Sequence, residues 1–216
     1  MPSPRKYATA GAFRRALEER LKRASLTEQI DPNRLRRQVS FDRLLAGLFR
    51  EEPAPWVLKG GYALELRFKA ARSTVDIDLT VQRGAPSAGG DGDWLGFAGI
   101  ESSRVLMIAR EQQFAEKIHA YTLPRNAANS RVKDLVDLAL LIVSGGLDKQ
   151  RILDALRLTF ERRGTHDLAS LLPPPADWQI PFQAMAEECG IPIDIAAVFA
   201  RVQEFVEEVL AQRTER

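Results

Sequence analysis

Two aspartates, Asp76 and Asp78, give the strongest chemical signal in the sequence. Apolar and polar residues alternate over 75–81, which predicts a β-strand with one apolar and one polar face. Both carboxylates would leave the polar face, about 7 Å apart. They repel each other unless a cation lies between them, and Mg²⁺ is commonly held by one or two carboxylates together with substrate phosphates. The pair therefore indicates a magnesium site, with a solvated strand face as the alternative.

A candidate phosphate-binding turn precedes these aspartates. Lys59, Gly60 and Gly61 follow the apolar run 56–58, and a short helix is predicted to begin just after the glycines. Backbone N–H groups at a helix N-terminus bind phosphate, and glycines let the phosphate approach closely. A Gly-Gly pair alone is common in turns. Beside the aspartates, it predicts a site for a nucleoside triphosphate (NTP) and its metal ion.

The turn that enters the aspartate segment contains Arg72 and Thr74. Both side chains are predicted to contact nucleotide phosphates, and ordinary loop solvation is the alternative. Phosphorylation of Thr74 would add about two negative charges beside Asp76. We therefore predict that phosphorylation of Thr74 blocks NTP binding.

A second group of charged residues lies farther along the chain. Lys117 falls in one predicted helix, and Asp134 and Asp137 fall on the leucine-bearing stripe of the next. Burying an unpaired carboxylate is costly, so these acids need cationic partners such as Arg131, Lys117 or a substrate cation. Structural salt bridges between helices are the alternative, and we favour that alternative for Asp137.

The elements that must position these residues can be predicted from periodicity, caps and prolines. Helices are expected over 10–25, 32–50, 62–69, 111–121, 131–143 and 148–161, near 166–172 and within 193–212, strands over 56–58, 75–81 and 104–109, and a loop over 83–99. This order indicates an α+β fold. We expect a small mixed β-sheet flanked by helices in residues 1–110 and a helical module in residues 111–216.

The composition is that of a soluble globular protein, with 45% apolar and 28% charged residues. No apolar run approaches the roughly 20 residues of a membrane span, and the start of the chain does not resemble an export signal. The single cysteine excludes an intrachain disulfide. We therefore expect a cytoplasmic protein without a membrane partner.

Charge is distributed unevenly. Residues 1–50 hold 12 Lys and Arg against 5 Asp and Glu, a net charge of 12 − 5 = +7, whereas residues 176–216 hold 3 against 8, a net charge of −5. A basic N-terminal part suits a polyanionic partner, and a solvated helix face is the alternative.

Four segments resemble motifs of the AbiEii/AbiGii toxin family, in the family's order. They are KGGYAL at 59–64, RSTVDIDL at 72–79, AEKIHA at 115–120 and RVKDLVDL at 131–138. This family includes the mycobacterial toxins of the MenT type and belongs to the DNA polymerase β-like nucleotidyltransferase superfamily. The resemblance implies a nucleotidyltransferase core with a helical C-terminal half.

The resemblance also implies an activity. Members are toxins of bacterial toxin–antitoxin systems, each paired with a separately encoded antitoxin, and some transfer nucleotides from NTPs to the 3′ end of tRNA, which inhibits translation and growth. Asp76 and Asp78 would bind the catalytic Mg²⁺, and Gly60 and Gly61 would hold phosphates. Lys117 would contact the triphosphate and Asp134 would have a catalytic role. Lys59, Arg72, Thr74 and Arg131 complete the expected nucleotide site.

The sequence departs from the superfamily at one point. A third acid often lies on a neighbouring strand, but segment 104–109 has none. Either Asp134 fills that need or the metal is bound more weakly. Two other functions stay open: nucleotidyl transfer to a protein or small-molecule hydroxyl, and a non-catalytic module that binds nucleotide or a partner.

Overall fold

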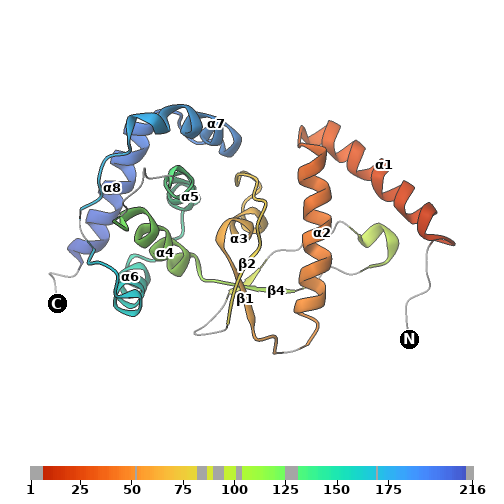
Figure 1. Cartoon of the computed structure of the whole chain (residues 1–216), viewed down its shortest axis with the longest axis horizontal. Helices are drawn as coiled ribbons and strands as arrows, with labels where there is room; N and C mark the ends of the chain where they lie inside the picture. Colours follow the sequence, from red (N-terminus) through yellow and green to blue (C-terminus); the bar gives the residue numbers. More distant parts are fainter. Residues whose placement is uncertain are drawn as a thin grey trace. The chain divides into compact units, whose positions relative to one another are not determined.

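The structure is a computed structural model. It describes residues 7–51, 53–81, 87–89, 95–100, 104–124, 131–168 and 170–212. The α+β fold expected from the sequence is confirmed, with a small mixed sheet and many helices (Figure 1). The chain divides into two compact units, the first formed by Met1–Arg67 with Ser73–Met107 and the second by Phe68–Arg72 with Ile108–Arg216.

The first unit opens with two helices whose starts follow from their capping residues. Helix α1 (Ala10–Glu28) is capped by Thr9, whose hydroxyl accepts a hydrogen bond from the backbone N–H of Ala12. Helix α2 (Pro32–Leu48) begins with a proline, and the Asp31 carboxylate accepts the backbone N–H groups of the two residues after that proline. Both helices begin where the sequence predicts.

The sheet of the first unit has the strand order β2-β1-β4-β3. Its strands are β1 (Trp56–Lys59), β2 (Asp78–Val81), β3 (Ser87–Gly89) and β4 (Val105–Met107). Strand β1 runs antiparallel to β2 and parallel to β4, and β3 runs antiparallel to β4, so the sheet is mixed as expected. Helix α3 (Gly60–Arg67) follows β1 directly.

Two sequence predictions about this sheet were wrong. The strand expected over 75–81 begins only at Asp78, because its partner β1 ends at Lys59, which pairs with Asp78. Asp76 therefore precedes the strand, and Val75 is 67% exposed. The loop expected over 83–99 contains β3 and a short 3₁₀-helix, η1 (Gly96–Ala98). The rest of that prediction, at 83–86 and 90–94, lies outside the described residues.

The second unit is helical. It contains α4 (Arg110–Thr122), α5 (Val132–Val143), α6 (Lys149–Arg163), the 3₁₀-helix η2 (Ala176–Trp178), α7 (Gln179–Cys189) and α8 (Ile195–Ala211). Helix α5 contacts α4, α7 and α8, and α6 packs on α4 (Figure 1). Most of α5 is consequently buried, including the two aspartates that the sequence places on its leucine stripe.

The helix predicted near 166–172 is wrong, and α7 is a helix that the sequence prediction missed. Gly164 ends α6 in a left-handed conformation, and the prolines at 173–175 disfavour helical backbone in the residue before them. Helix α7 accommodates Pro181 because this proline lies in the first helical turn, where the missing N–H has no partner inside the helix. Among the described residues, no helix is long and apolar enough to span a membrane.

Candidate functional site

The turn between β1 and α3 holds the carboxylate of Asp78 against Gly60. Gly60 has φ +69°, in the left-handed region that favours glycine. Strand pairing sets Asp78 opposite Lys59, so the Asp78 side chain lies beside the next residue of that turn. A Cβ atom on Gly60 would lie 1.9 Å from Oδ2 of Asp78. Glycine is thus required at position 60 for two reasons: the backbone has a positive φ, and the Asp78 carboxylate fills the space that a side chain would need. The Asp78 carboxylate therefore lies at the start of α3.

Both aspartates of the pair face solvent. Asp76 and Asp78 are exposed, Lys59 and Gly60 are half-buried, and Gly61 is buried. Among the residues that the structure describes, no cluster of three His, Cys, Asp or Glu side chains could hold a metal ion by itself. Two exposed carboxylates nevertheless fit Mg²⁺, because this ion commonly takes one or two protein carboxylates and completes its shell with phosphates and water.

Thr74, a predicted phosphate contact, is held by a buried acid. Thr74 is only 8% exposed, and its backbone N–H donates a hydrogen bond to Oε2 of Glu65 at 3.2 Å. Sequence reasoning did not single out Glu65. The signal was available, since Glu65 is an acid among the apolar residues of a short helix, the same anomaly that drew attention to Asp134.

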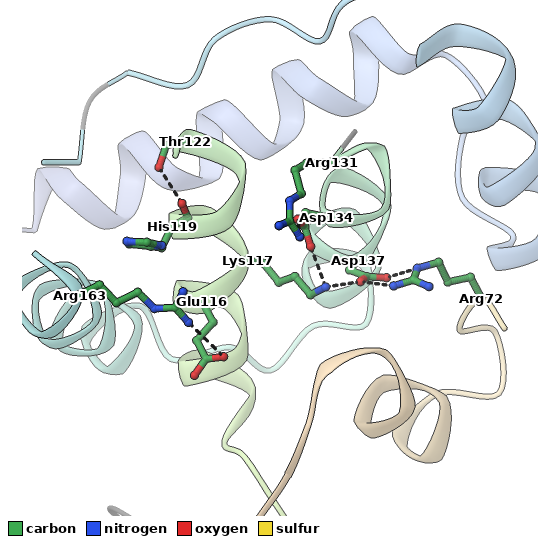
Figure 2. Close-up of polar contacts among 9 residues, drawn as sticks. All are labelled: Arg72, Glu116, Lys117, His119, Thr122, Arg131, Asp134, Asp137 and Arg163. Atoms are coloured by element: carbon green, nitrogen blue, oxygen red, sulfur yellow. Dashed lines mark hydrogen bonds and ion pairs between the residues drawn. The ribbon is translucent and has the colours of Figure 1, made fainter. Parts of the chain in front are cut away.

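The second unit contains a chain of ion pairs (Figure 2). The Lys117 ammonium lies 2.8 Å from Oδ1 of Asp134 and 2.6 Å from Oδ2 of Asp137. Asp137 also accepts two hydrogen bonds from Arg72, from Nε and Nη2, each at 2.9 Å. Arg72, expected at nucleotide phosphates, is therefore engaged here in a two-point ion pair. The salt-bridge role favoured for Asp137 agrees with these contacts.

Burial makes this network electrostatically strong. Asp134 is 4% exposed and Asp137 is 1% exposed, so each requires a nearby cation. Burial by itself lowers the pKa of Lys117, but the attraction of Asp137 and Asp134 outweighs burial and the pKa is raised. The pKa of Arg72 is likewise raised, because its contacts with Asp137 outweigh the effect of burial. Lys117 therefore remains a cation at neutral pH.

One oxygen of this network is left for another donor. Oδ2 of Asp134 is buried and accepts no hydrogen bond from the part of the chain that the structure describes. Nη1 of Arg131 lies 3.6 Å from this oxygen, which is beyond ordinary hydrogen-bond length. Oδ2 of Asp134 can thus accept one more hydrogen bond while Lys117 occupies Oδ1.

The predicted site residues fall into two groups, one in each unit. The first unit brings Lys59, Gly60, Gly61, Thr74, Asp76 and Asp78 to the β1–α3 turn and the segment that enters β2. The second unit brings together Arg72, Lys117, Arg131 and Asp134, with Asp137 added by the structure.

Comparison with known protein families identifies the family of the chain. A family model described as "Nucleotidyl transferase AbiEii toxin, Type IV TA system" matches residues 43–96 and 89–208, which is most of the chain and includes every predicted site residue. A search of curated proteins found no match. On the strength of the family match, the chain belongs to the AbiEii nucleotidyl transferase toxins of type IV toxin–antitoxin systems.

Proposed function

We propose that this toxin transfers a nucleoside monophosphate from an NTP to the 3′ end of tRNA, with Mg²⁺ held by Asp76 and Asp78. The family supplies the reaction class, and the metal and the acceptor are our additions. The observation that carries the proposal is the placement of the Asp78 carboxylate against Gly60 at the start of α3. A cation on this carboxylate would lie beside a helix N-terminus, where backbone N–H groups favour phosphate.

In the proposed reaction, the 3′-hydroxyl oxygen of the acceptor bonds to the α-phosphorus and the bond to the β-phosphate oxygen breaks. The hydroxyl proton leaves with a base, and pyrophosphate departs. Mg²⁺, when bound, would neutralise phosphate charge and favour ionisation of the attacking hydroxyl. Such transfer depends on positioning and on charge stabilisation by fixed groups.

The buried network of the second unit suits two further roles. Lys117 is kept charged by Asp134 and Asp137, so we assign it to the negative charge of the triphosphate and the leaving pyrophosphate. Oδ2 of Asp134 accepts no hydrogen bond from the described residues, so we assign it as an acceptor for a substrate hydroxyl. Arg131, half-buried beside Asp134, is proposed as an additional phosphate contact.

The acceptor proposal rests on charge. Helix α1 exposes Arg14, Arg15 and Lys22, and the first fifty residues carry a net charge of 12 − 5 = +7. Lys and Arg contacts to phosphates dominate the affinity of proteins for RNA. An enzyme that uses tRNA and NTPs acts in the cytoplasm, and we propose that a separately encoded antitoxin restrains it there.

The proposal is tested by incubating total tRNA with each α-³²P-labelled NTP and Mg²⁺, followed by denaturing electrophoresis. We expect label in tRNA with the wild type, and at least about 100-fold less with Asp76→Asn or Asp78→Asn. Asp177→Asn, at an exposed acid of η2, is the matched control and should act as the wild type.

Three outcomes would contradict the proposal. Equal labelling by the wild type and Asp76→Asn would remove the metal role of that carboxylate. Label in protein or in a small molecule, with none in RNA, would replace the acceptor. No transfer with any NTP or acceptor would favour a binding module without catalysis.

A further inference from the structure

Glu65 is a buried carboxylate that joins three segments of the first unit. Its side chain is 2% exposed. Oε1 accepts hydrogen bonds from Nε of Arg34 and Nε2 of Gln38, both on α2 and both at 2.8 Å. Oε2 accepts the backbone N–H of Thr74 at 3.2 Å. One carboxylate thus connects α2 and α3 to the segment that carries Asp76.

That segment, residues 73–77, forms no helix or strand, because β2 begins at Asp78. Arg37, on the same face of α2 as Arg34 and Gln38, donates a hydrogen bond to the Ser73 hydroxyl. Two successive residues, Ser73 and Thr74, are therefore tied to one face of α2, directly or through Glu65.

We propose that Glu65 is a positioning residue for the metal-binding aspartates. It fixes the backbone of Thr74, two residues before Asp76, and thereby sets where the Asp76 carboxylate meets the cation. Metal ligands need their geometry held to about 0.5 Å, which an irregular segment cannot supply without such support. The inference rests on the proposed function, because it presumes that Asp76 and Asp78 bind Mg²⁺.

The substitution Glu65→Gln separates positioning from bulk structure. It keeps the size of the side chain but replaces one acceptor oxygen with an NH₂ donor. The remaining oxygen is retained best by Arg34 and Gln38, since two donors, one of them charged, outweigh one neutral donor. The NH₂ group then faces the N–H of Thr74, so the link to the aspartate segment is lost while the contact with α2 persists.

The matched control removes a contact between Glu65 and α2 and keeps the contact between Glu65 and Thr74. Gln38→Met removes one hydrogen bond between α2 and Glu65 but leaves Oε2 with Thr74. If Glu65 only holds α2 and α3 together, both variants should behave alike. If it positions the aspartates, only Glu65→Gln should weaken metal binding.

The experiment measures Mn²⁺ binding to the full-length protein by titration in the presence of an NTP analogue that cannot be hydrolysed. Mn²⁺ is chosen because its free concentration can be followed by electron paramagnetic resonance. We expect at least fivefold weaker Mn²⁺ binding for Glu65→Gln and less than a twofold change for Gln38→Met. In the transfer reaction, Glu65→Gln should need at least fivefold more Mg²⁺ for half-maximal rate, with kcat at saturating Mg²⁺ reduced less than threefold.

Wild-type Mn²⁺ affinity for Glu65→Gln, or equal weakening in both variants, would overturn the positioning role while leaving the proposed function intact. Absence of Mn²⁺ binding and of transfer in the wild type would overturn both. Should Glu65→Gln fail to fold, as judged by circular dichroism, Glu65→Asp replaces it, because the shorter side chain keeps the charge beside Arg34 but cannot also reach the N–H of Thr74. Unchanged Mn²⁺ binding by Glu65→Asp would then reject the proposal.

Discussion

The absence of a side chain at Gly60 leaves room for the carboxylate of Asp78. From the sequence, we expected this glycine to let a phosphate approach the backbone. In the structure, the Asp78 carboxylate occupies the space that a Cβ atom on Gly60 would take. The positive φ of Gly60 and this contact arise from the same turn, in which β1 ends and α3 begins. A side chain at this position would therefore strain the backbone and displace a proposed metal ligand together.

We predict that Gly60→Ala reduces nucleotidyl transfer at least about 100-fold, because the Asp78 carboxylate has to leave its place. The left-handed backbone should cost about 1–2 kcal/mol of unfolding free energy besides. Transfer is measured with labelled NTP, and stability is measured by urea unfolding. Activity near that of the wild type would show that the position of Asp78 at Gly60 is not needed.

Gly47 provides the control within the same unit. It lies in α2, and a Cβ there would meet no other atom within 4 Å. Gly47→Ala should therefore stabilise the protein by about 0.5–1 kcal/mol, because alanine favours the helix, and should leave transfer unchanged.

At the scale of elements, Asp137 joins α5 to α4 and to segment 68–72. Both of its oxygens accept hydrogen bonds from Arg72, and Oδ2 also pairs with the Lys117 ammonium. The Asp137 side chain is 1% exposed. A buried ion pair does not stabilise a fold simply by existing, because both charges lose their water. Removal of one partner is nevertheless costly, since the other is left buried and uncompensated.

We predict that Asp137→Ala destabilises the second unit by about 3–5 kcal/mol, because Arg72 and Lys117 both lose a buried counter-charge. Urea unfolding followed by circular dichroism measures this loss. The control is Glu208→Ala, which removes an exposed pair with Lys149 and should cost less than about 1 kcal/mol. Similar losses for the two variants would mean that the Asp137 pairs contribute little.

The helices and strands also show where the periodicity of apolar residues is enough to predict the bounds of an element. Helices α4, α5 and α6 begin and end within two residues of their predicted bounds, because each has a regular apolar stripe. Strand β2 is shorter than its alternating pattern, since a strand extends only as far as its partner β1 reaches. Helix α7, which was not predicted, tolerates its proline because that residue occupies the first turn.

At the scale of the whole molecule, stability should depend on pH through His119. This histidine is buried, Nε2 is 2.9 Å from the hydroxyl of Thr165, and the ring meets Phe160 edge to face. Burial lowers the pKa of His119 to about 4, assisted by Arg163 and His166, while Glu116 acts in the opposite direction. The folded state therefore favours the neutral imidazole.

The direction of the pH effect follows from this lowered pKa. Between about pH 6.5 and about pH 4 the unfolded chain binds a proton that the folded protein does not, so stability is complete above that window and is lost as pH falls through it. The loss should reach up to about 3 kcal/mol. Melting temperatures from pH 7.5 to pH 4 measure it, and His119→Gln should flatten the curve. An equal slope in both proteins would reject this assignment.

The uneven charge of the chain predicts that tRNA binding depends steeply on salt. If four phosphates are contacted, affinity should fall roughly 50-fold between 50 and 200 mM salt. The double variant Arg14→Ala and Arg15→Ala on α1 should bind more weakly and with a shallower salt dependence, as measured by fluorescence anisotropy. Arg157→Ala with Arg162→Ala, on α6, removes the same charge and is the control. A flat salt dependence in the wild type would contradict an RNA surface on α1.

The sequence by itself determined the features that depend on near neighbours. The start of α2 follows from Asp31 and its proline, and the α+β class follows from the order of periodic segments. The sequence also named Lys117 among the possible cationic partners of Asp134, because buried acids require cations, and the structure shows that pair. The resemblance of four short motifs identified the family that the family match then confirmed.

Only the tertiary structure decided which distant groups meet. Arg72 and Asp137 are 65 positions apart, and Arg34 and Glu65 are 31 apart, so no local pattern links them. Strand pairing and helix packing bring such groups together, and desolvation then selects the partners that satisfy a buried charge. For this reason the sequence named the aspartates of the candidate site, whereas the contacts of Glu65 with Thr74 and of Gly60 with Asp78 came only from the structure.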